Sequence, residues 1–505
     1  TAYESSLGLV GAEMCIRDSL RGFDMSDDAT TEIVPGWETV IGLEVHAELA
    51  TATKLFSDAP NRFGGEPNTN VDPVSLGLPG SLPVLNEQAV ELAIRVGLSL
   101  HCRVQRSVFA RKNYFYPDMP KDFQISQYDL PINEEGWMEL ADGRRVGIER
   151  AHLEEDTGKS THVGGGGRIH EAGHSLVDYN RAGVPLIEIV GAPDLRSAED
   201  ARAYVSELRS ILVAIGASDG KMEEGSMRVD CNVSVRPVGD PELGTRCEIK
   251  NINSLRSLGR AIVYESHRQV DLITSGERVE QQTRHWNEDE GRTHKLRSKE
   301  EAYDYRYFPE PDLLPVDPSE EWIESVRGAL PVLPRERRHR LAEVAGVDTA
   351  TASLTVERGM DDLAVDAITA GADSARVLVH VENNLADGAG ALTAASFAAL
   401  VAMEVGGDLT ATQAKKVLAT LVADGGNPAA VAADLGFEAM DDGVLESVVD
   451  DLIAAHPEDW AAFTSGDDKE RKKKSGFFVG KVMKATSGQA DGRVVNEILA
   501  RRAGA

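Results

Sequence analysis

Short runs of β-forming residues, separated by Gly, Pro and Asn turns, fill the chain from Thr31 to about Pro315. In several runs apolar and polar residues alternate, as in strands with one buried face, and stretches with helical periodicity lie between them. The predicted strands cover residues 39–49, 108–116, 146–153, 185–190, 226–235 and 246–252, and the predicted helices cover 87–98, 197–215 and 257–275. This mixture predicts one large α+β domain, bounded by residues 31 and 320.

The pattern becomes helical from about Val326. Ala-rich amphipathic segments replace the strands, and Pro331 and Pro334 mark the junction. The predicted helices include residues 335–345, 391–404, 410–423 and 444–455. Gly425-Gly426-Asn427-Pro428 is a candidate for a second junction. We therefore predict an all-α helical domain over residues 326–430 and a helical tail over residues 440–505.

Acidic residues recur beside apolar β-formers in the first domain. Glu44 and His46 lie two residues apart in a predicted strand, so their side chains should share a face. Further acids stand in His152-Leu153-Glu154-Glu155-Asp156, at Glu188 and at Glu248. Burying unpaired carboxylates is costly, whereas a divalent cation such as Mg²⁺ gathers several of them and leaves room for phosphate oxygens.

Composition restricts the function classes. The 505 residues carry 53 Lys and Arg against 83 Asp and Glu, a net charge of -30, which argues against a general nucleic-acid binder. Such acidity also fits a salt-adapted, haloarchaeal source, where screening permits a polyanionic partner. The four cysteines form no CxxC pair, as expected of reduced cytoplasmic thiols. No apolar run is long enough to span a bilayer, so we expect a cytoplasmic protein without a membrane partner.

Three features are set aside. Gly158-Lys159-Ser160 ends like a phosphate-binding P-loop, but the first required glycine is replaced by Leu153 and the intervening residues are acidic. Gly164–Gly167 with His170 and His174 could bind phosphate or a transition metal, although a hairpin connection is favoured. Residues 1–24 do not match the rest and contain a segment like a translated sequencing adapter, so we predict a non-native extension, with a targeting peptide as the alternative.

Several unusual segments together resemble one family. They include VIGLEVHAEL at 40–49, LGLPGSLPVLN at 76–86, RKNYFYPDMPKDFQISQY at 111–128, DYNRAGVPLIEIV at 178–190, SMRVDCNVSV at 226–235 and EIKNINS at 248–254. In order and spacing these segments resemble the B subunits of tRNA-dependent amidotransferases (GatB), from Thr39 onward. The related archaeal E subunits carry an inserted domain, for which the predicted strands leave no room.

The resemblance implies a fold and a function. The fold is α+β, with a glutamine-synthetase-like antiparallel-sheet catalytic (cradle) domain followed by a helical domain and a YqeY-like tail. The activity is that of a kinase and transamidase subunit that uses ATP and Mg²⁺ to convert Asp-tRNA(Asn) or Glu-tRNA(Gln) to Asn-tRNA(Asn) or Gln-tRNA(Gln). An acyl phosphate is the intermediate, and an amidase partner (the A subunit), together with a small C subunit, supplies ammonia. A salt-adapted archaeal source would favour the aspartyl substrate.

The same resemblance implies roles for individual residues. It assigns cofactor and metal binding to Glu44, His46, Glu154 and Glu188, with Glu248 as a further metal ligand. Solvated or salt-bridged strand faces are the alternative for each glutamate. Lys121, Arg228 and Lys250 are weaker candidates for contacting phosphate or the aminoacyl end, since cations near a transferring group offset its charge; surface solubility is their alternative.

One departure from the family concerns zinc. Many relatives carry a Cys-x-Cys and a Cys-x-x-Cys early in the chain, whereas these positions here are Ser57, Ala59, Asp72 and Ser75. Thiolates hold a structural zinc, so the sequence predicts no structural zinc and a segment from Lys54 to Leu78 held by packing alone.

The end of the chain is basic within an acidic protein. Between Lys469 and Arg502, Lys and Arg greatly outnumber acids. A solvated face is the usual explanation of a charge run, but here contact with the tRNA body is favoured. The predicted tRNA-binding residues are Arg471, Lys472, Lys473, Lys474, Lys481 and Lys484. Arg335, Arg337, Arg338 and Arg340 form a second, weaker phosphate candidate.

Two other functions remain open. A stand-alone carboxylate-ammonia ligase of the glutamine synthetase type accounts for the carboxylates and leaves the basic tail unexplained. A non-catalytic tRNA-binding scaffold accounts for the tail and leaves the carboxylates unexplained. The transamidating kinase subunit is preferred because it accounts for both features.

Overall fold

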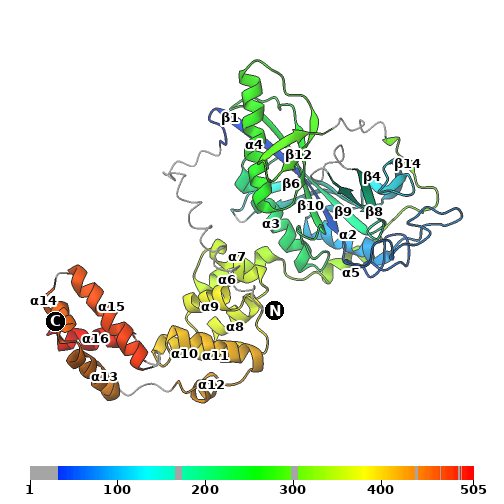
Figure 1. The fold of residues 1–505 in the computed structure, drawn as a ribbon. Coiled ribbons are helices and arrows are strands. Elements are labelled where there is room, and N and C mark those ends of the chain that lie inside the picture. The colour runs from blue at the N-terminus through cyan, green and yellow to red at the C-terminus, as the bar shows by residue number, and fades with distance from the viewer. Residues whose placement is uncertain are drawn as a thin grey trace. The chain divides into compact units, whose positions relative to one another are not determined.

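A computed structural model describes residues 32–140, 142–164, 173–296, 305–437, 442–466, 468–486, 490 and 492–504. The predicted extension over residues 1–24 lies outside this range. Contacts within the chain divide it into two compact units, with the principal division between Gly328 and Ala329. Figure 1 shows strands together with helices in the first unit and helices alone in the second. The predicted α+β class is confirmed.

A twelve-stranded sheet is the centre of the first unit, and among its strands in the described residues only β11 and β12 pair in parallel. Its main path runs β13-β12-β11-β10-β1-β9-β6-β4-β3-β14, with β5 pairing to β6 and to β2. The strands are β1 (Trp37–Glu48), β2 (Arg103–Val104), β3 (Val108–Asn113), β4 (Phe123–Leu130), β5 (Asn133–Glu139), β6 (Arg145–Glu155), β9 (Pro185–Gly191), β10 (Met227–Pro237), β11 (Cys247–Ile252), β12 (Gln282–Asn287), β13 (Arg292–Lys295) and β14 (Phe308–Pro309). All six predicted strands are present, whereas β2, β4, β5, β12, β13 and β14 were not predicted.

Helices cover the apolar side of this sheet. They are α2 (Glu87–Ser99), α3 (Ala198–Ala214) and α4 (Leu255–Thr274), which match the predicted helices, and α5 (Glu320–Gly328) packs against α2. Asn86 and Ser254 accept hydrogen bonds from backbone N–H groups of the first turns of α2 and α4, which fixes where these helices begin. Helix α4 packs on β10 and β11, and α2 on β5 and β6.

Alternation along the central strands gives the sheet two different faces. Ile41, Leu43, Val45 and Ala47 of β1 are fully buried, and the polar residues between them point to the other side. At the end of β9, a Cβ on Gly191 would lie only 3.0 Å from the hydroxyl of Tyr204 on α3. A glycine therefore allows α3 to approach the strand that carries Glu188.

A separate two-stranded hairpin consists of β7 (Lys159–Val163) and β8 (His174–Asp178). Lys159 and Ser160 thus begin a strand, whereas a P-loop requires a helix after its lysine. This observation confirms that no P-loop is present here. The two strands pair antiparallel, as the predicted hairpin requires, and His174 is exposed on β8, whereas Gly165–Gly167 and His170 lie outside the described residues.

The second unit contains two hydrophobic cores. The first core is built from α6 (Pro334–Ala345), α7 (Thr349–Glu357), α8 (Asp361–Thr369), α9 (Ser374–Asn384), α10 (Ala394–Gly406), α11 (Ala411–Asp424) and α12 (Pro428–Asp434). The second is built from α13 (Asp442–Ala455), α14 (Pro457–Ser465), α15 (Asp468–Ala485) and α16 (Gly492–Arg502). Asn427 caps α12, whose Ala432 belongs to the first core, so the Gly425–Pro428 segment is a turn within that core.

Candidate active site

Acidic and basic side chains gather on the polar face of five adjacent strands, in the spatial order β11-β10-β1-β9-β6. Glu44 lies opposite Asp230, and His46 lies opposite Glu188. On the next strand, His152 also lies opposite Glu188. Directly opposed residues of antiparallel strands point to the same side of the sheet, so this register brings together residues far apart in sequence.

The first cluster consists of His46, Glu154 and Glu188, whose potential ligand atoms lie within 4.8 Å of one another. His46 Nε2 is 3.4 Å from Glu188 Oε2 and 4.0 Å from Glu154 Oε1. Burial and repulsion from Glu188 raise the pKa of Glu154 to about 7. Burial also opposes ionisation of Glu188, but His152, His46 and Arg150 outweigh it and hold its pKa below the usual range. A divalent cation would favour ionisation of both carboxylates, so this donor set fits one.

His152 adds a second imidazole to this cluster. Its ring is buried, and among the described residues neither ring nitrogen has a hydrogen-bond partner. Its Nε2 lies 4.0 Å from Glu154 Oε2 and 3.9 Å from Glu188 Oε2. Burial lowers the pKa of His152 to about 4, so the ring is neutral at physiological pH and has a lone pair to offer. Buried polar atoms are normally satisfied, which makes Nε2, the nitrogen beside the two carboxylates, a fit for a metal ion.

We expect the His152→Ala variant to bind Mn²⁺ at this cluster at least about tenfold more weakly than the unaltered protein, because a donor is lost. Mn²⁺ titration followed by electron paramagnetic resonance measures the affinity, and circular dichroism checks the fold. His162→Ala is the matched control, since His162 lies on the hairpin strand β7 and contacts Ser175 there. Equal affinities of the two variants would show that His152 is not a ligand.

The second cluster consists of Glu44, Asp230 and Glu248, again with potential ligand atoms within 4.8 Å. The ammonium of Lys250 pairs with Asp230 and lies 2.7 Å from Glu248 Oε1, and Asn232 donates a hydrogen bond of 2.9 Å to Glu44. Burial, with the charges of Glu188 and Glu248, raises the pKa of Glu44. The all-oxygen donor set fits Mg²⁺.

The structure thus divides the five predicted metal ligands between two clusters. Glu44 and Glu248 belong to the second cluster, and the other three predicted residues belong to the first. Sequence reasoning did not select Asp230 or His152 as ligands. Both follow the same alternation as residues that it did select: His152 stands two residues before Glu154, and Asp230 two residues after Arg228.

The three predicted cations lie in different surroundings. Lys250 lies at the second cluster. Arg228 lies opposite His46 in the register, 2.8 Å from Asp156 Oδ2. Lys121 forms a buried ion pair of 2.5 Å with Glu155, to which Ile125 also donates its backbone N–H. Glu155 follows Glu154 in β6, and successive strand residues point to opposite faces. The structure therefore does not bring Lys121 to the carboxylate clusters.

Hydrogen bonds as well as packing hold residues 54–78, the segment that lacks the zinc-binding cysteines of relatives. Asp72 accepts hydrogen bonds from the backbone N–H groups of Val74 and Ser75 and from the Ser75 hydroxyl. The buried ammonium of Lys54 donates to the carbonyl of Asn70 at 2.8 Å. Burial would raise the pKa of Asp72, but the hydrogen bonds from Ser75 and the charge of Lys54 hold that pKa below its usual range. The expectation of packing alone is therefore wrong, and the predicted lack of zinc stays a prediction.

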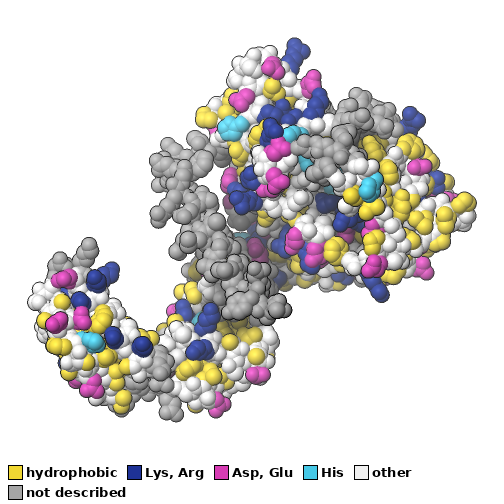
Figure 2. All heavy atoms as spheres, viewed as in Figure 1, with side chains coloured by type: hydrophobic (Ala, Val, Ile, Leu, Met, Phe, Trp, Pro, Cys, Tyr) yellow, Lys and Arg dark blue, Asp and Glu magenta, His cyan; other side chains and the backbone are white. Residues whose placement is uncertain are grey.

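The basic tail presents fewer free charges than its sequence indicates. Lys472, Lys473 and Lys484 are exposed on α15, whereas Lys474 pairs with Asp459 at 2.5 Å. At the other predicted positions, Arg471 donates a hydrogen bond to the Thr464 carbonyl and Lys481 lies 5.4 Å from the ring centroid of Phe477. Arg501 and Arg502 pair with acids of α13. Figure 2 shows both charge types on the visible face of this core. Contact with tRNA stays a prediction.

Most arginines of the second phosphate candidate are paired with acids or buried, and phosphate contact by them stays a prediction. Arg337 and Arg340 both pair with the fully buried Asp361, and Arg338 is itself buried. Arg337 and Arg340 join α6 to α8 through these ion pairs.

No helix among the described residues is long and apolar enough to cross a membrane.

Comparisons with known proteins agree with the motifs. A sequence model of the GatB/GatE catalytic domain matches residues 39–324, and a model described as GatB domain matches residues 376–502. The chain is 47% identical to the B subunit of aspartyl/glutamyl-tRNA(Asn/Gln) amidotransferase from Corynebacterium glutamicum, over 93% of this chain and 99% of the relative. The protein of the same name from Frankia casuarinae is 48% identical, over 94% of this chain and 97% of the relative. The one from Synechococcus elongatus is 44% identical, over 93% of this chain and 98% of the relative.

These relatives are bacterial, and they give no support to the expectation of a haloarchaeal source. Their names specify the B subunit, as the sequence motifs predicted in preference to the E type. With both family models matched in order and nearly half of the residues identical to full-length relatives, the chain belongs to the GatB family, the B subunits of aspartyl/glutamyl-tRNA(Asn/Gln) amidotransferases.

Proposed function

We propose that this chain is the tRNA-binding, ATP-dependent kinase and transamidase subunit that converts Asp-tRNA(Asn), Glu-tRNA(Gln) or both to the amidated aminoacyl-tRNA. The observation that carries the proposal is the pair of neighbouring clusters on one sheet face, His46, Glu154 and Glu188 beside Glu44, Asp230 and Glu248. Two cation sites on adjacent strands suit a reaction in which negative charge moves between a phosphate and a carboxylate.

The chemistry requires activation because a carboxylate is a poor acyl donor. An oxygen of the substrate side-chain carboxylate attacks the γ-phosphorus of ATP, the bond from that phosphorus to the ADP oxygen breaks, and ADP leaves. Ammonia then attacks the carbonyl carbon of the acyl phosphate, the bond from that carbon to the phosphate oxygen breaks, and inorganic phosphate departs with the proton that the nitrogen loses. Mg²⁺ would offset the phosphate charge during the first step.

The protein's residues have separate roles in this scheme. His46, Glu154 and Glu188, joined by His152, would hold one cation, and Glu44, Asp230 and Glu248 would hold another. Lys250 neutralises part of the second cluster while no cation is bound. Arg228, next to His46 and paired with Asp156, is placed to meet an anionic substrate group if it leaves that pair.

Partners complete the proposed reaction. The chain has no amidase signature, so an amidase partner (the A subunit), together with a small C subunit, would release ammonia from glutamine. The exposed lysines of α15 would contact the tRNA body through its phosphates, a contact that requires no base readout. A cytoplasmic location follows from a role in protein synthesis.

Trapping the acyl phosphate tests the proposal. The chain, purified with its amidase and small C partners, is incubated with ATP, Mg²⁺ and hydroxylamine, which converts an acyl phosphate to a stable hydroxamate. We expect hydroxamate and ADP with Asp-tRNA(Asn) or Glu-tRNA(Gln), and neither product with uncharged tRNA. Equal formation with free aspartate or glutamate would establish the stand-alone ligase instead. Binding of tRNA without ATP cleavage in the complete complex would establish the scaffold.

A further inference from the structure

Lys112 on β3 is a cation that sequence reasoning did not select, and the sheet register places it on the polar face. Lys112 lies opposite Gln124 of β4, and Ser126 of the same strand lies opposite Glu154 of β6. Gln124 and Ser126 are two residues apart, so their side chains share a face. Lys112 therefore points to the same side of the sheet as Glu154. Its neighbour Arg111 points to the other side, where it pairs with Glu310.

The ammonium of Lys112 is held by an aromatic ring and not by a carboxylate. It lies 4.7 Å from the centroid of Tyr305, in cation–π distance. Asn113 fixes the Tyr305 backbone through a hydrogen bond of 2.7 Å to its carbonyl. Among the residues that the structure describes, no acid lies within ion-pair distance of Lys112. Lys121, Arg228 and Lys250, in contrast, all pair with acids.

The charge of Lys112 acts on the first cluster. Burial raises the pKa of Glu154, and Lys112 is the largest of the influences that lower it. Lys112 also contributes to lowering the pKa of His152, after burial, Arg150 and His46. The Lys112 ammonium thus interacts electrostatically with the first cluster, and its N–H donors can bind an anion there.

We propose that Lys112 donates hydrogen bonds to the γ-phosphoryl group of ATP while that group moves to the substrate carboxylate, and that the Tyr305 ring positions Lys112 for this contact. This inference rests on the function proposed above. No proton is transferred: the ammonium keeps its charge throughout, while the bond from phosphorus to ADP breaks and the bond to the carboxylate oxygen forms. A cation at this point stabilises charge on the transferring oxygens more than charge on bound ATP.

The test measures hydroxamate formation from charged tRNA by the complete complex with the amidase and small C partners. We expect the Lys112→Met variant to lose about 10²- to 10³-fold in kcat, with the KM for ATP changed much less, because the lost contact acts on the transferring group. Mn²⁺ affinity should be unchanged or higher, since a positive charge next to the cluster is removed. Lys295→Met is the matched control: Lys295 lies on β13 and pairs with the exposed Glu280.

Variants of Tyr305 test the positioning role. Tyr305→Phe keeps the ring and should retain near-normal kcat, whereas Tyr305→Leu removes it and should lower kcat, with the KM for ATP little changed. A rise in KM at constant kcat in Lys112→Met would make Lys112 a ground-state binder, and joint loss of Mn²⁺ affinity and melting temperature would make it structural; either result overturns the proposal. Failure of the unaltered complex to form hydroxamate would instead refute the proposed function.

Discussion

The Glu188→Gln variant is expected to lose ATP-dependent phosphorylation of charged tRNA by about 10³-fold or more. Three side chains converge on the Glu188 carboxylate: His46 Nε2 at 3.4 Å, His152 Nε2 at 3.9 Å and Arg150 Nη2 at 3.6 Å. Glutamine has nearly the same shape but no charge, so the variant should fold. It removes the one carboxylate of this cluster whose pKa its surroundings hold below the usual range.

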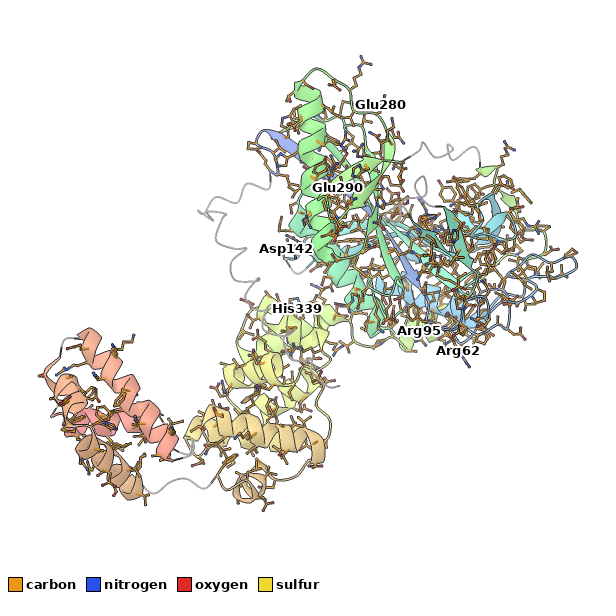
Figure 3. All side chains as sticks on the ribbon, viewed as in Figure 1. Arg62, Arg95, Asp142, Glu280, Glu290 and His339 are labelled. Carbon is orange, nitrogen blue, oxygen red and sulfur yellow. The ribbon has the colours of Figure 1, made fainter. Side chains whose placement is uncertain are left out.

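Hydroxamate formation and Mn²⁺ titration measure the two consequences together. Glu280→Gln is the control, because Glu280 (labelled in Figure 3) is exposed and its carboxylate contacts only Lys295 among the described residues. We expect the control to keep full activity and Mn²⁺ affinity. If Glu188→Gln retained more than about a tenth of normal activity, the first cluster could not be the cation site of the reaction.

The Asp361→Ala variant is expected to destabilise the helical unit by about 2–3 kcal/mol, since it removes the charged hydrogen bonds that a buried carboxylate accepts from two partly exposed arginines. The side chain of Asp361 is fully buried and receives both Arg337 and Arg340, the second at 3.0 Å. These contacts join α6 to the start of α8. Chemical denaturation followed by circular dichroism measures the loss.

The adjacent residue supplies a matched control for Asp361. Asp362 also pairs with Arg340, but its side chain is exposed. Asp362→Ala should therefore cost no more than about 1 kcal/mol, as surface ion pairs do. Equal costs for the two variants would contradict the structural role assigned to Asp361. If Asp361→Ala freed the arginines to bind tRNA more tightly without loss of stability, their first interpretation as phosphate contacts would regain support.

Alternation along a strand predicts which face a residue lies on, but it does not predict which metal cluster the residue joins. Period-two alternation correctly predicts that Glu44 and His46 share the polar face of β1. It does not reveal that the two residues join different clusters, because β10 supplies Asp230 on one side of β1 and β9 supplies Glu188 on the other. Strand order is set by pairings between distant segments. Asp230 and His152 were missed for the same reason. Each becomes a candidate ligand only because the neighbouring strand places another carboxylate beside it.

The cations and the helical arginines show the same limit. Lys112 and Lys121 lie in one motif, and composition offers no reason to choose between them. The β3–β4–β6 register directs Lys112 toward the polar face, whereas Lys121 is buried against Glu155. Arg337 and Arg340 form a basic run in the sequence, and only the fold brings Asp361 to them.

The sequence by itself determined the family, the α+β class, the six strands with their polar and apolar sides, and the helices with strong periodicity, because these follow from local patterns and from motifs that few other chains share. The tertiary structure alone decided which carboxylates form each cluster, which cations are already paired and which basic residues are buried. Such properties depend on distances of a few Å between residues distant in sequence, and the register of the sheet and the packing of the helices set those distances.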